Sequence, residues 1–264
     1  MHASSYRKME HFVEAYLAQS ADRPLEIIDF GSQQVNPVSL TYRTLLDRPP
    51  WRYRGLDIEA GHNVDVCVKD AYDWPEIDSD SIDVVVSGQA LEHVEYFWAS
   101  AFEIGRVLRP GGLMMLIAPS GGYEHRFPLD CWRFYTDGMR SLATLLRFEL
   151  IDAHTDWGNE VWEDSVVVIR KPVMSVDEAH EFATRVALQK AFLADRPKVT
   201  RTTRATEPAM PSVLPHPTPG SLTSRLQAHS LGEKVKGRVM WFGERFAGRS
   251  GRRLASRIRR ALTR

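Results

Sequence analysis

Three aspartates of this chain, Asp29, Asp57 and Asp70, each end a stretch of residues that reads as a strand. The carboxyl ends of parallel strands meet at one edge of an open α/β sheet, and ligands bind at that edge. A carboxylate there accepts hydrogen bonds, so Asp57 is suited to the hydroxyls of a ribose and Asp70 to the amino group of an adenine. Each acid also has a plainer interpretation. Asp29 could cap the next element, Asp57 could be a turn residue, and Asp73 could take the binding role expected of Asp70.

A single glycine follows the first predicted strand, in the sequence GSQQVN at 31–36. A loop that binds pyrophosphate needs two more glycines, so that its backbone can approach the phosphates. With one close approach at Gly31, the ligand that fits is S-adenosylmethionine, whose positive sulfonium also suits an acidic cleft. We expect Ser32, Ile58, Ala71 and Gly88 to contribute to the same site.

The elements that must position these residues follow from the hydrophobic pattern. Apolar residues at helical spacing predict helices, and the RPGG sequence at 109–112 is expected to end the second of them. The continuous apolar runs at 84–86 and 113–118 are typical of strands covered on both faces, as in a parallel sheet. The predicted helices are 5–18, 96–108 and 176–194; the predicted strands are 25–30, 52–58, 64–70, 82–88, 113–118, 148–154 and 164–170.

The chain resembles the class I S-adenosylmethionine-dependent methyltransferases over residues 22–172. The resemblance rests on five motifs in order: IIDFGS, YRGLDIE, VKDAYDWP, IDVVVSGQALEHV and EIGRVLRPGGLMMLIAP. It implies a Rossmann-like α/β sandwich with a mostly parallel seven-stranded sheet and an antiparallel end. The loop after Gly31 departs from the usual G-x-G-x-G and is similar to that of methyltransferases from bacterial glycan and polysaccharide clusters. One hypothesis within this group is a methylmannose polysaccharide O-methyltransferase like those of mycobacteria.

Two segments past the fourth and fifth strands offer groups for methyl transfer. Removing a proton from an acceptor hydroxyl requires a base, and His93 and Glu92 in LEHV are candidates. The segment 121–138 adds His125 together with aromatic residues that could stack on a sugar face, such as Trp132 and Tyr135. The alternatives are a structural role for His93 and a solvated loop histidine at 125.

A metal ion is a further possibility at this place. The resemblance implies that Glu92 and His93 could hold Mg²⁺ against substrate hydroxyls, although Gln89 replaces an acid that some relatives have. His125 or Asp130 could complete such a site.

Charge divides the chain into an acidic body and a basic end. Residues 222–264 hold twelve Lys and Arg against two acids, a net charge of +10, so residues 1–221 carry −10. We expect a methyltransferase domain over 1–196, a Pro-rich linker over 197–221 and a basic amphipathic helical tail over 222–264. The tail could contact a membrane surface, remain a flexible or oligomer-forming segment, or, as the least favoured reading, bind nucleic acid.

Bulk properties limit the location and class of the protein. Only Cys67 and Cys131 occur, without CxxC spacing, and no apolar run reaches the length of a membrane span. The sequence predicts a cytoplasmic protein, with peripheral membrane contact through the tail as an option, and does not indicate its oligomeric state.

Three functional hypotheses follow. The first is an O-methyltransferase acting on a hydroxyl of a saccharide or glycan intermediate, so that the partner is an oligosaccharide or small molecule. The second is a methyltransferase of a small metabolite such as a quinone or lipid. The third is a non-catalytic, methyltransferase-like interaction module, which would have no reason to retain acids at 29, 57 and 70.

Overall fold

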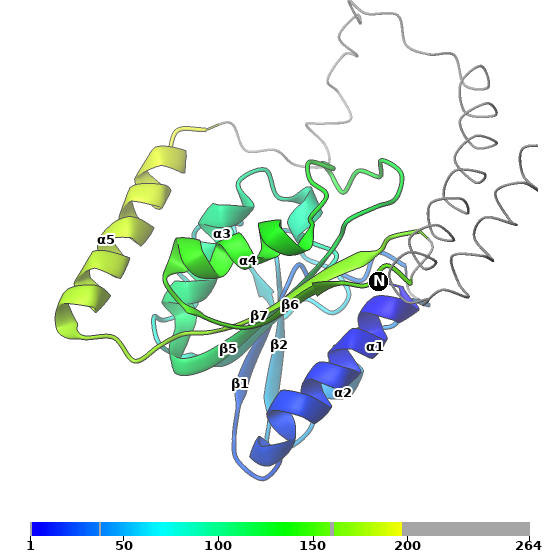
Figure 1. Ribbon diagram of the computed structural model, residues 1–264, viewed down its shortest axis with the longest axis horizontal. Coiled ribbons are helices and arrows are strands. Elements are labelled where there is room, and N and C mark those ends of the chain that lie inside the picture. The colour runs from blue at the N-terminus through cyan, green and yellow to red at the C-terminus, as the bar shows by residue number, and fades with distance from the viewer. Residues whose placement is uncertain (1, 37, 159–160, 197–264) are drawn as a thin grey trace, which may run out of the picture. The chain divides into compact units, whose positions relative to one another are not determined.

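The computed structural model describes residues 2–36, 38–158 and 161–196 (Figure 1). The predicted linker and tail, 197–221 and 222–264, lie outside the described residues.

A seven-stranded sheet with the order β3-β2-β1-β4-β5-β7-β6 forms the centre of the described part. Strands β1, β2, β3, β4 and β5 pair in parallel, and β7 runs antiparallel between β5 and β6. The Rossmann-like α/β fold with an antiparallel end is therefore confirmed. The strands are β1 Glu26–Phe30, β2 Arg52–Asp57, β3 Val66–Cys67, β4 Ile82–Gly88, β5 Leu108–Pro119, β6 Glu149–Thr155 and β7 Asp164–Arg170.

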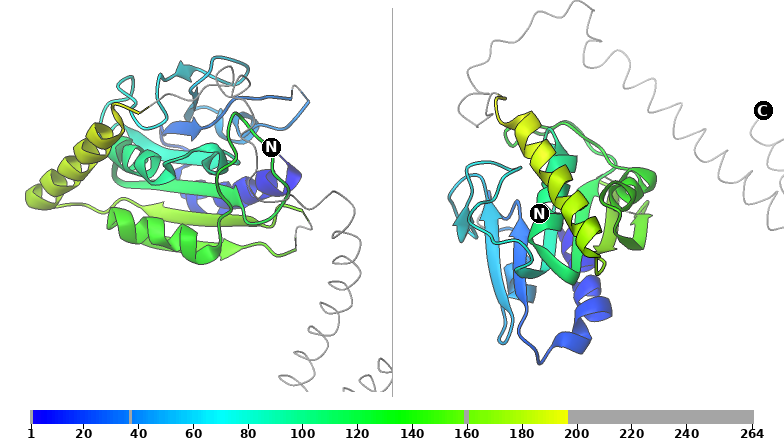
Figure 2. Two further views of the ribbon diagram at one scale, coloured as in Figure 1. Left: turned by 90° about the horizontal axis from the view of Figure 1, so that it is seen from above. Right: turned by 90° about the vertical axis from the view of Figure 1, so that its left-hand side faces the viewer.

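Helices cover both faces of this sheet (Figures 1 and 2). One face carries α3, α4 and α5, and the opposite face carries α1 and the short α2. The longest helix, α5, begins with a capping box, in which Ser175 and Glu178 satisfy each other's backbone amides. The helices are α1 Ala3–Phe12, α2 Arg43–Leu46, α3 Phe97–Val107, α4 Thr136–Leu146 and α5 Val176–Leu193.

Successive side chains of each central strand pack in the two different hydrophobic cores, because side chains alternate between the faces of a sheet. In β1, Ile27 packs on the α1 face and Ile28 on the α3–α5 face, and both are fully buried. In β5, Met115 likewise packs on the α1 face and Met114 on the α3–α5 face. This double burial explains why the strands read as continuous apolar runs.

Three expectations about elements need correction. The strand expected at 64–70 is only Val66–Cys67, because β3 pairs with β2 at just two positions and Asp70 lies in a bridge with Asp73 beyond it. The RPGG sequence belongs to β5, which starts directly after α3 and is longer than the predicted 113–118. The expected helix 5–18 becomes α1 followed by a π-helical turn, Val13–Leu17, which keeps the apolar face buried.

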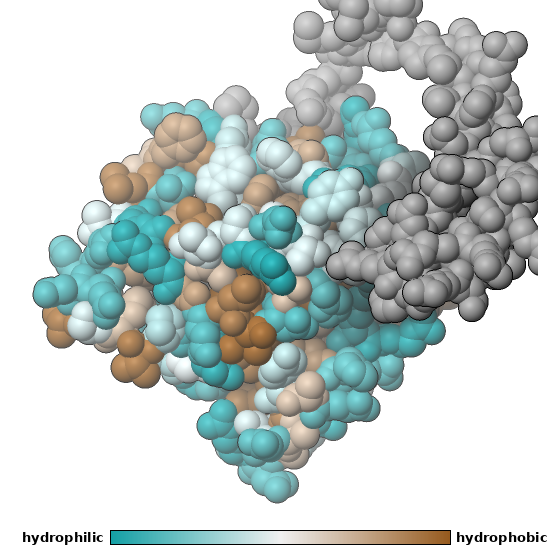
Figure 3. Space-filling view, in the orientation of Figure 1, coloured by the Kyte–Doolittle hydropathy of each residue, from teal (hydrophilic) through white to brown (hydrophobic). Residues whose placement is uncertain are grey.

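The surface drawn in Figure 3 is mainly hydrophilic, with apolar side chains in small groups between polar ones. Among the described residues no helix has the length and apolar character that crossing a membrane requires.

Candidate active site

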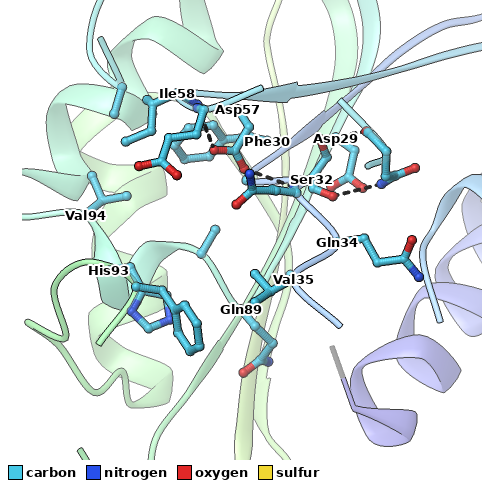
Figure 4. A pocket seen from close by; sticks show the side chains of 18 of the residues that line it. Asp29, Phe30, Ser32, Gln34, Val35, Asp57, Ile58, Gln89, His93 and Val94 are labelled. Atoms are coloured by element: carbon cyan, nitrogen blue, oxygen red, sulfur yellow. Dashed lines mark hydrogen bonds between the residues drawn. The ribbon is translucent and has the colours of Figure 1, made fainter. Parts of the chain in front are cut away.

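A cavity of about 550 Å³ opens at the carboxyl ends of β1, β2 and β4. The strand order reverses between β1 and β4, and ligands of open α/β sheets bind at such a point. In Figure 4, Asp57 lies on one side of this opening, and His93 and Gln89 lie on the other. All eight residues expected to bind the cofactor line the cavity: Asp29, Gly31, Ser32, Asp57, Ile58, Asp70, Ala71 and Gly88.

Gly31 forms the turn that leaves β1. Its φ of +76° lies in the left-handed region, and a Cβ at this position would approach the Ala90 Cβ to 2.3 Å. The Gly31 amide donates to the Leu56 carbonyl at 2.9 Å, which directs the loop across the end of β2. Glycine is therefore required here by both conformation and space.

Asp57 lies where its carboxylate can accept hydrogen bonds from the hydroxyl groups of a ligand. It accepts backbone hydrogen bonds from Ile58 at 2.8 Å, Gln33 at 3.0 Å and Glu59 at 3.3 Å. Burial raises the pKa of the Asp57 carboxyl, and these amides lower it. A carboxylate has about four acceptor positions, so three amides leave capacity for a ligand.

Asp29 is nearly inaccessible, with 3% of its surface exposed. The Tyr53 hydroxyl donates to it at 2.6 Å. Burial raises the pKa of the Asp29 carboxyl to about 7, although the Tyr53 hydrogen bond acts in the opposite direction. A cation placed in the cavity would favour its charged form.

Asp70 lines the cavity in an unexpected arrangement. The Arg196 guanidinium donates to both of its oxygens, at 2.6 and 3.1 Å. Ala71 lies beside it, and the Ala71 carbonyl accepts from Trp74 and Ser100. The side chain expected to accept from an adenine is therefore already fixed by a guanidinium.

The remaining cofactor-binding candidates contribute shape. Ser32 Oγ donates to the Asn63 carbonyl at 3.0 Å and so ties the loop to the segment after β2. A Cβ at Gly88 would lie 2.0 Å from the Tyr42 hydroxyl, so glycine lets this buried tyrosine reach the end of β4.

His93 lies in a short 3₁₀ helix after β4 and faces the cavity. Its Nδ1 is 2.6 Å from the Leu129 carbonyl, which can only accept, so this nitrogen carries the proton. Burial lowers the pKa of the His93 imidazole. Nε2 is thus left with a lone pair, which can accept a proton or bind a metal ion but cannot do both at once.

Glu92 is fully buried beside it. Within the part of the chain that the structure describes, neither carboxylate oxygen is hydrogen-bonded to another residue. Burial raises the pKa of the Glu92 carboxyl to about 8. Buried carboxylates normally have partners, so this one calls for an explanation.

His125 completes a group of three possible metal ligands with Glu92 and His93. One ligand atom of each residue lies within 4.8 Å of the others, and the two imidazole rings meet edge to face at 4.9 Å. Asp130, the alternative third ligand, is instead held by Arg133 at 2.6 Å and accepts from the His125 amide at 2.7 Å. The donor set of two imidazoles and one carboxylate fits a divalent ion, and it suits Zn²⁺-like ions better than Mg²⁺, which prefers oxygen ligands.

The two aromatic residues expected to stack on an acceptor lie elsewhere. Trp132 packs on Phe97 and donates from its indole to the carbonyls of Val94 and Glu95. Tyr135 stacks with Trp157 outside the cavity lining. The rings grouped with His93 in the cavity lining are instead those of His2, His125, Phe127 and Trp162.

Sequence reasoning missed Trp162, His2 and Arg196. His125 contacts Trp162 at 4.7 Å between ring centroids, and His2 stacks on the same indole at 5.6 Å. Because β7 is antiparallel, the residues just before it lie at the ligand edge, and this signal could have revealed Trp162. We find no comparable signal for His2 or Arg196.

Comparisons with known proteins find methyltransferases similar to part of this chain. A family described as "Methyltransferase domain" matches residues 46–116. Two curated proteins, each named an uncharacterized methyltransferase, are similar over 92 residues: one from Mycobacterium avium (strain 104) at 34% identity and one from Mycolicibacterium paratuberculosis (strain ATCC BAA-968 / K-10) at 33%. Each match covers 33% of this chain and 34% of the relative, so the chain matches about a third of the length of these proteins.

The family match and these relatives show that part of this chain is similar to methyltransferases, and the sheet has the mostly parallel order with an antiparallel end that the sequence predicts. A solved structure of the 1,6-didemethyltoxoflavin-N1-methyltransferase of Burkholderia thailandensis is also similar, at 16% identity and a TM-score of 0.48, over 64% of this chain and 79% of that one. The names of the two mycobacterial relatives specify no acceptor.

Proposed function

We propose that this protein transfers the methyl group of S-adenosylmethionine to a hydroxyl of a saccharide or glycan intermediate. The observation that carries the proposal is the cavity at the ends of β1, β2 and β4, with Asp57 and Asp29 on one side and His93 on the other. The carboxylates suit the ribose and the cationic end of the donor. The histidine suits the proton of the acceptor.

The reaction is an in-line displacement. The acceptor oxygen forms a bond to the methyl carbon as the bond from carbon to sulfur breaks, and the sulfonium becomes a neutral thioether. The acceptor proton passes to Nε2 of His93, which is available because Nδ1 is bound to the Leu129 carbonyl. Most of the rate enhancement in such a site comes from holding the two reactants in line.

The acceptor side of the cavity supports a ring-shaped substrate. The indole of Trp162 and the ring of Phe127 offer flat apolar faces, while His125 offers a polar edge. A sugar presents one apolar face and a rim of hydroxyls, and so matches this combination. The same rings would accept a flat quinol, which keeps a small-metabolite methyltransferase as the second candidate.

Binding of the product S-adenosylhomocysteine tests the donor site. We expect wild-type protein to bind it in calorimetry, and Asp57→Ala to weaken binding by about 2–3 kcal/mol, because charge-assisted hydrogen bonds to the ribose are lost. Asp83→Ala is the matched control, since this carboxylate lies at the start of β4, at the opposite edge of the sheet. A wild-type protein that does not bind the product would refute the proposal. If it does bind, labelled donor incubated with glycans, quinones and RNA identifies the acceptor class.

A divalent ion at Glu92, His93 and His125 is the alternative to His93 acting as the base. An ion bound there would give the buried Glu92 carboxylate a positively charged ligand partner. It would also make an acceptor hydroxyl more acidic. Metal content after dialysis against Zn²⁺, Mn²⁺ or Mg²⁺ tests this directly. We expect about one ion per chain, its loss in Glu92→Gln, and retention in Glu124→Gln; an equal metal content in Glu92→Gln would exclude the site.

A further inference from the structure

Arg196 lies three residues beyond the end of α5 and forms part of the cavity wall. Its two terminal nitrogens donate to the two oxygens of Asp70, at 2.6 and 3.1 Å. Both side chains are 15% exposed, so the pair is largely shielded from water. The guanidinium also lies over the ring of Tyr72, 4.2 Å from its centroid.

The end of α5 is fixed to the segment after β3 by several independent contacts. Lys190 pairs with Asp73 at 2.6 Å, and Leu193 is buried in a small apolar cluster with Tyr72 and Ala99. The Leu193 carbonyl accepts from Nη1 of Arg196 at 2.9 Å. The guanidinium is therefore held in one place by the fold and by its own helix end.

A two-pronged contact determines the orientation of a carboxylate as well as its position. The Tyr72 amide donates to the same Asp70 side chain at 3.0 Å, from the plane of the backbone. Asp70 is thus held in a fixed orientation in the cavity lining.

We propose that Arg196 is a positioning residue for donor recognition. It holds the Asp70 carboxylate so that it accepts from the exocyclic amino group of adenine, and the segment after α5 thereby completes the adenine end of the site. This inference rests on the proposed function, because it requires an adenosyl ligand in the cavity. It also implies selectivity, since a purine with a carbonyl oxygen at the same position would place two acceptors face to face.

Calorimetry with the full-length protein tests the inference. We expect Arg196→Gln to weaken binding of S-adenosylhomocysteine by roughly tenfold or more, because the acceptor is no longer held in place. Arg140→Gln is the matched control: it removes an exposed cation of α4, and neither Arg140 nor its partner Asp137 lines the cavity. This control should bind within twofold of wild type.

A second ligand separates positioning from general damage. S-inosylhomocysteine carries the carbonyl in place of the amino group, and wild type should bind it much more weakly. Arg196→Gln should reduce the ratio of the two affinities, and in an Asp70→Asn background the same change should have little further effect.

Unchanged product affinity in Arg196→Gln, or an equal loss in Arg140→Gln, would overturn the role of Arg196 and leave the proposed function intact. A wild-type protein that binds neither ligand would overturn the proposed function itself.

Discussion

At the scale of single residues, the site depends on which nitrogen of His93 carries the proton. The Leu129 carbonyl fixes that proton on Nδ1, so Nε2 is the reactive atom whether it acts as a base or as a metal ligand. The base and metal hypotheses therefore share one atom and predict different responses to chelation.

His93→Ala should lower turnover by roughly 10²–10⁴-fold, because the group that accepts the proton or holds the ion is removed. Affinity for S-adenosylhomocysteine should stay within a fewfold, since the donor carboxylates lie on the other side of the cavity. Steady-state kinetics and calorimetry measure the two effects separately. His154→Ala, on the exposed strand β6, is the control.

EDTA distinguishes the two roles of His93. Activity that survives EDTA but is lost in His93→Ala indicates the base, and activity abolished by EDTA and restored by a divalent ion indicates the ligand. Near-normal turnover of His93→Ala would contradict both and make His125 the next candidate.

Residue types predicted the cavity lining at the strand ends better than the lining contributed by the loops. Asp29, Asp57 and Gly31 were predictable because each lies at or just after the end of a predicted strand. The partner of Asp70 was not, because Arg196 is 126 residues away and only tertiary packing brings it there. The positions of the rings that line the cavity depend on how the loops fold over the carboxyl edge of the sheet. The spacing of apolar residues in the sequence does not predict loop conformation.

At the scale of elements, the approach of α1 to the sheet edge depends on one glycine in β4. The Tyr42 hydroxyl occupies the space where Gly88 has no side chain, and it is hydrogen-bonded to Ser5 of α1 at 2.7 Å. A short chain of contacts therefore links α1, the α2 region and the cavity.

Gly88→Ala should destabilise the protein by about 1–3 kcal/mol, because the new methyl group would collide with a fully buried tyrosine. Gly138→Ala makes the opposite test in α4, where nothing lies within 4 Å of the added Cβ. This variant should gain roughly 0.5–1 kcal/mol from helix propensity. Urea unfolding of both variants measures the difference, and equal stabilities would contradict this account of the strand end.

The strands themselves were largely predictable because both of their faces are buried. The exceptions have physical causes. At β3 only two residues find a partner on β2, so the apolar residues further along 64–70 do not form a strand. At β5 pairing with β4 and β7 extends the strand beyond its apolar core into RPGG.

At the scale of the whole molecule, buried carboxyl groups couple stability to pH. Asp29 has a pKa of about 7 in the folded protein, above the ordinary value of 3.8. A raised pKa means that the folded state binds the proton more tightly, so the contribution to stability is complete below about pH 4 and is lost as pH rises towards 7.

Asp29→Asn should remove this dependence, at roughly 1.4 kcal/mol per pH unit of the shift. Urea unfolding at pH 5 and pH 7.5 should therefore show wild type losing more stability on raising the pH than the variant does. Identical losses would show that Asp29 ionises normally in the folded protein. Asp156→Asn is the control: the Lys8 ammonium lowers the pKa of Asp156 below 3.8, so the contribution of this carboxyl to stability is constant from pH 5 to pH 7.5 and is lost only in stronger acid.

The two borders of the sheet bear on edge-to-edge association between copies of this fold. A border strand exposes unpaired backbone groups, which can recruit a second chain and begin aggregation. At one border, β3 is only two residues long and offers almost no template. At the other, β6 has an irregular register between Leu150 and Asp152 and carries the charged Glu149 and Asp152. Short length on one side and a charged, irregular strand on the other therefore protect the described fold from edge-to-edge polymerisation.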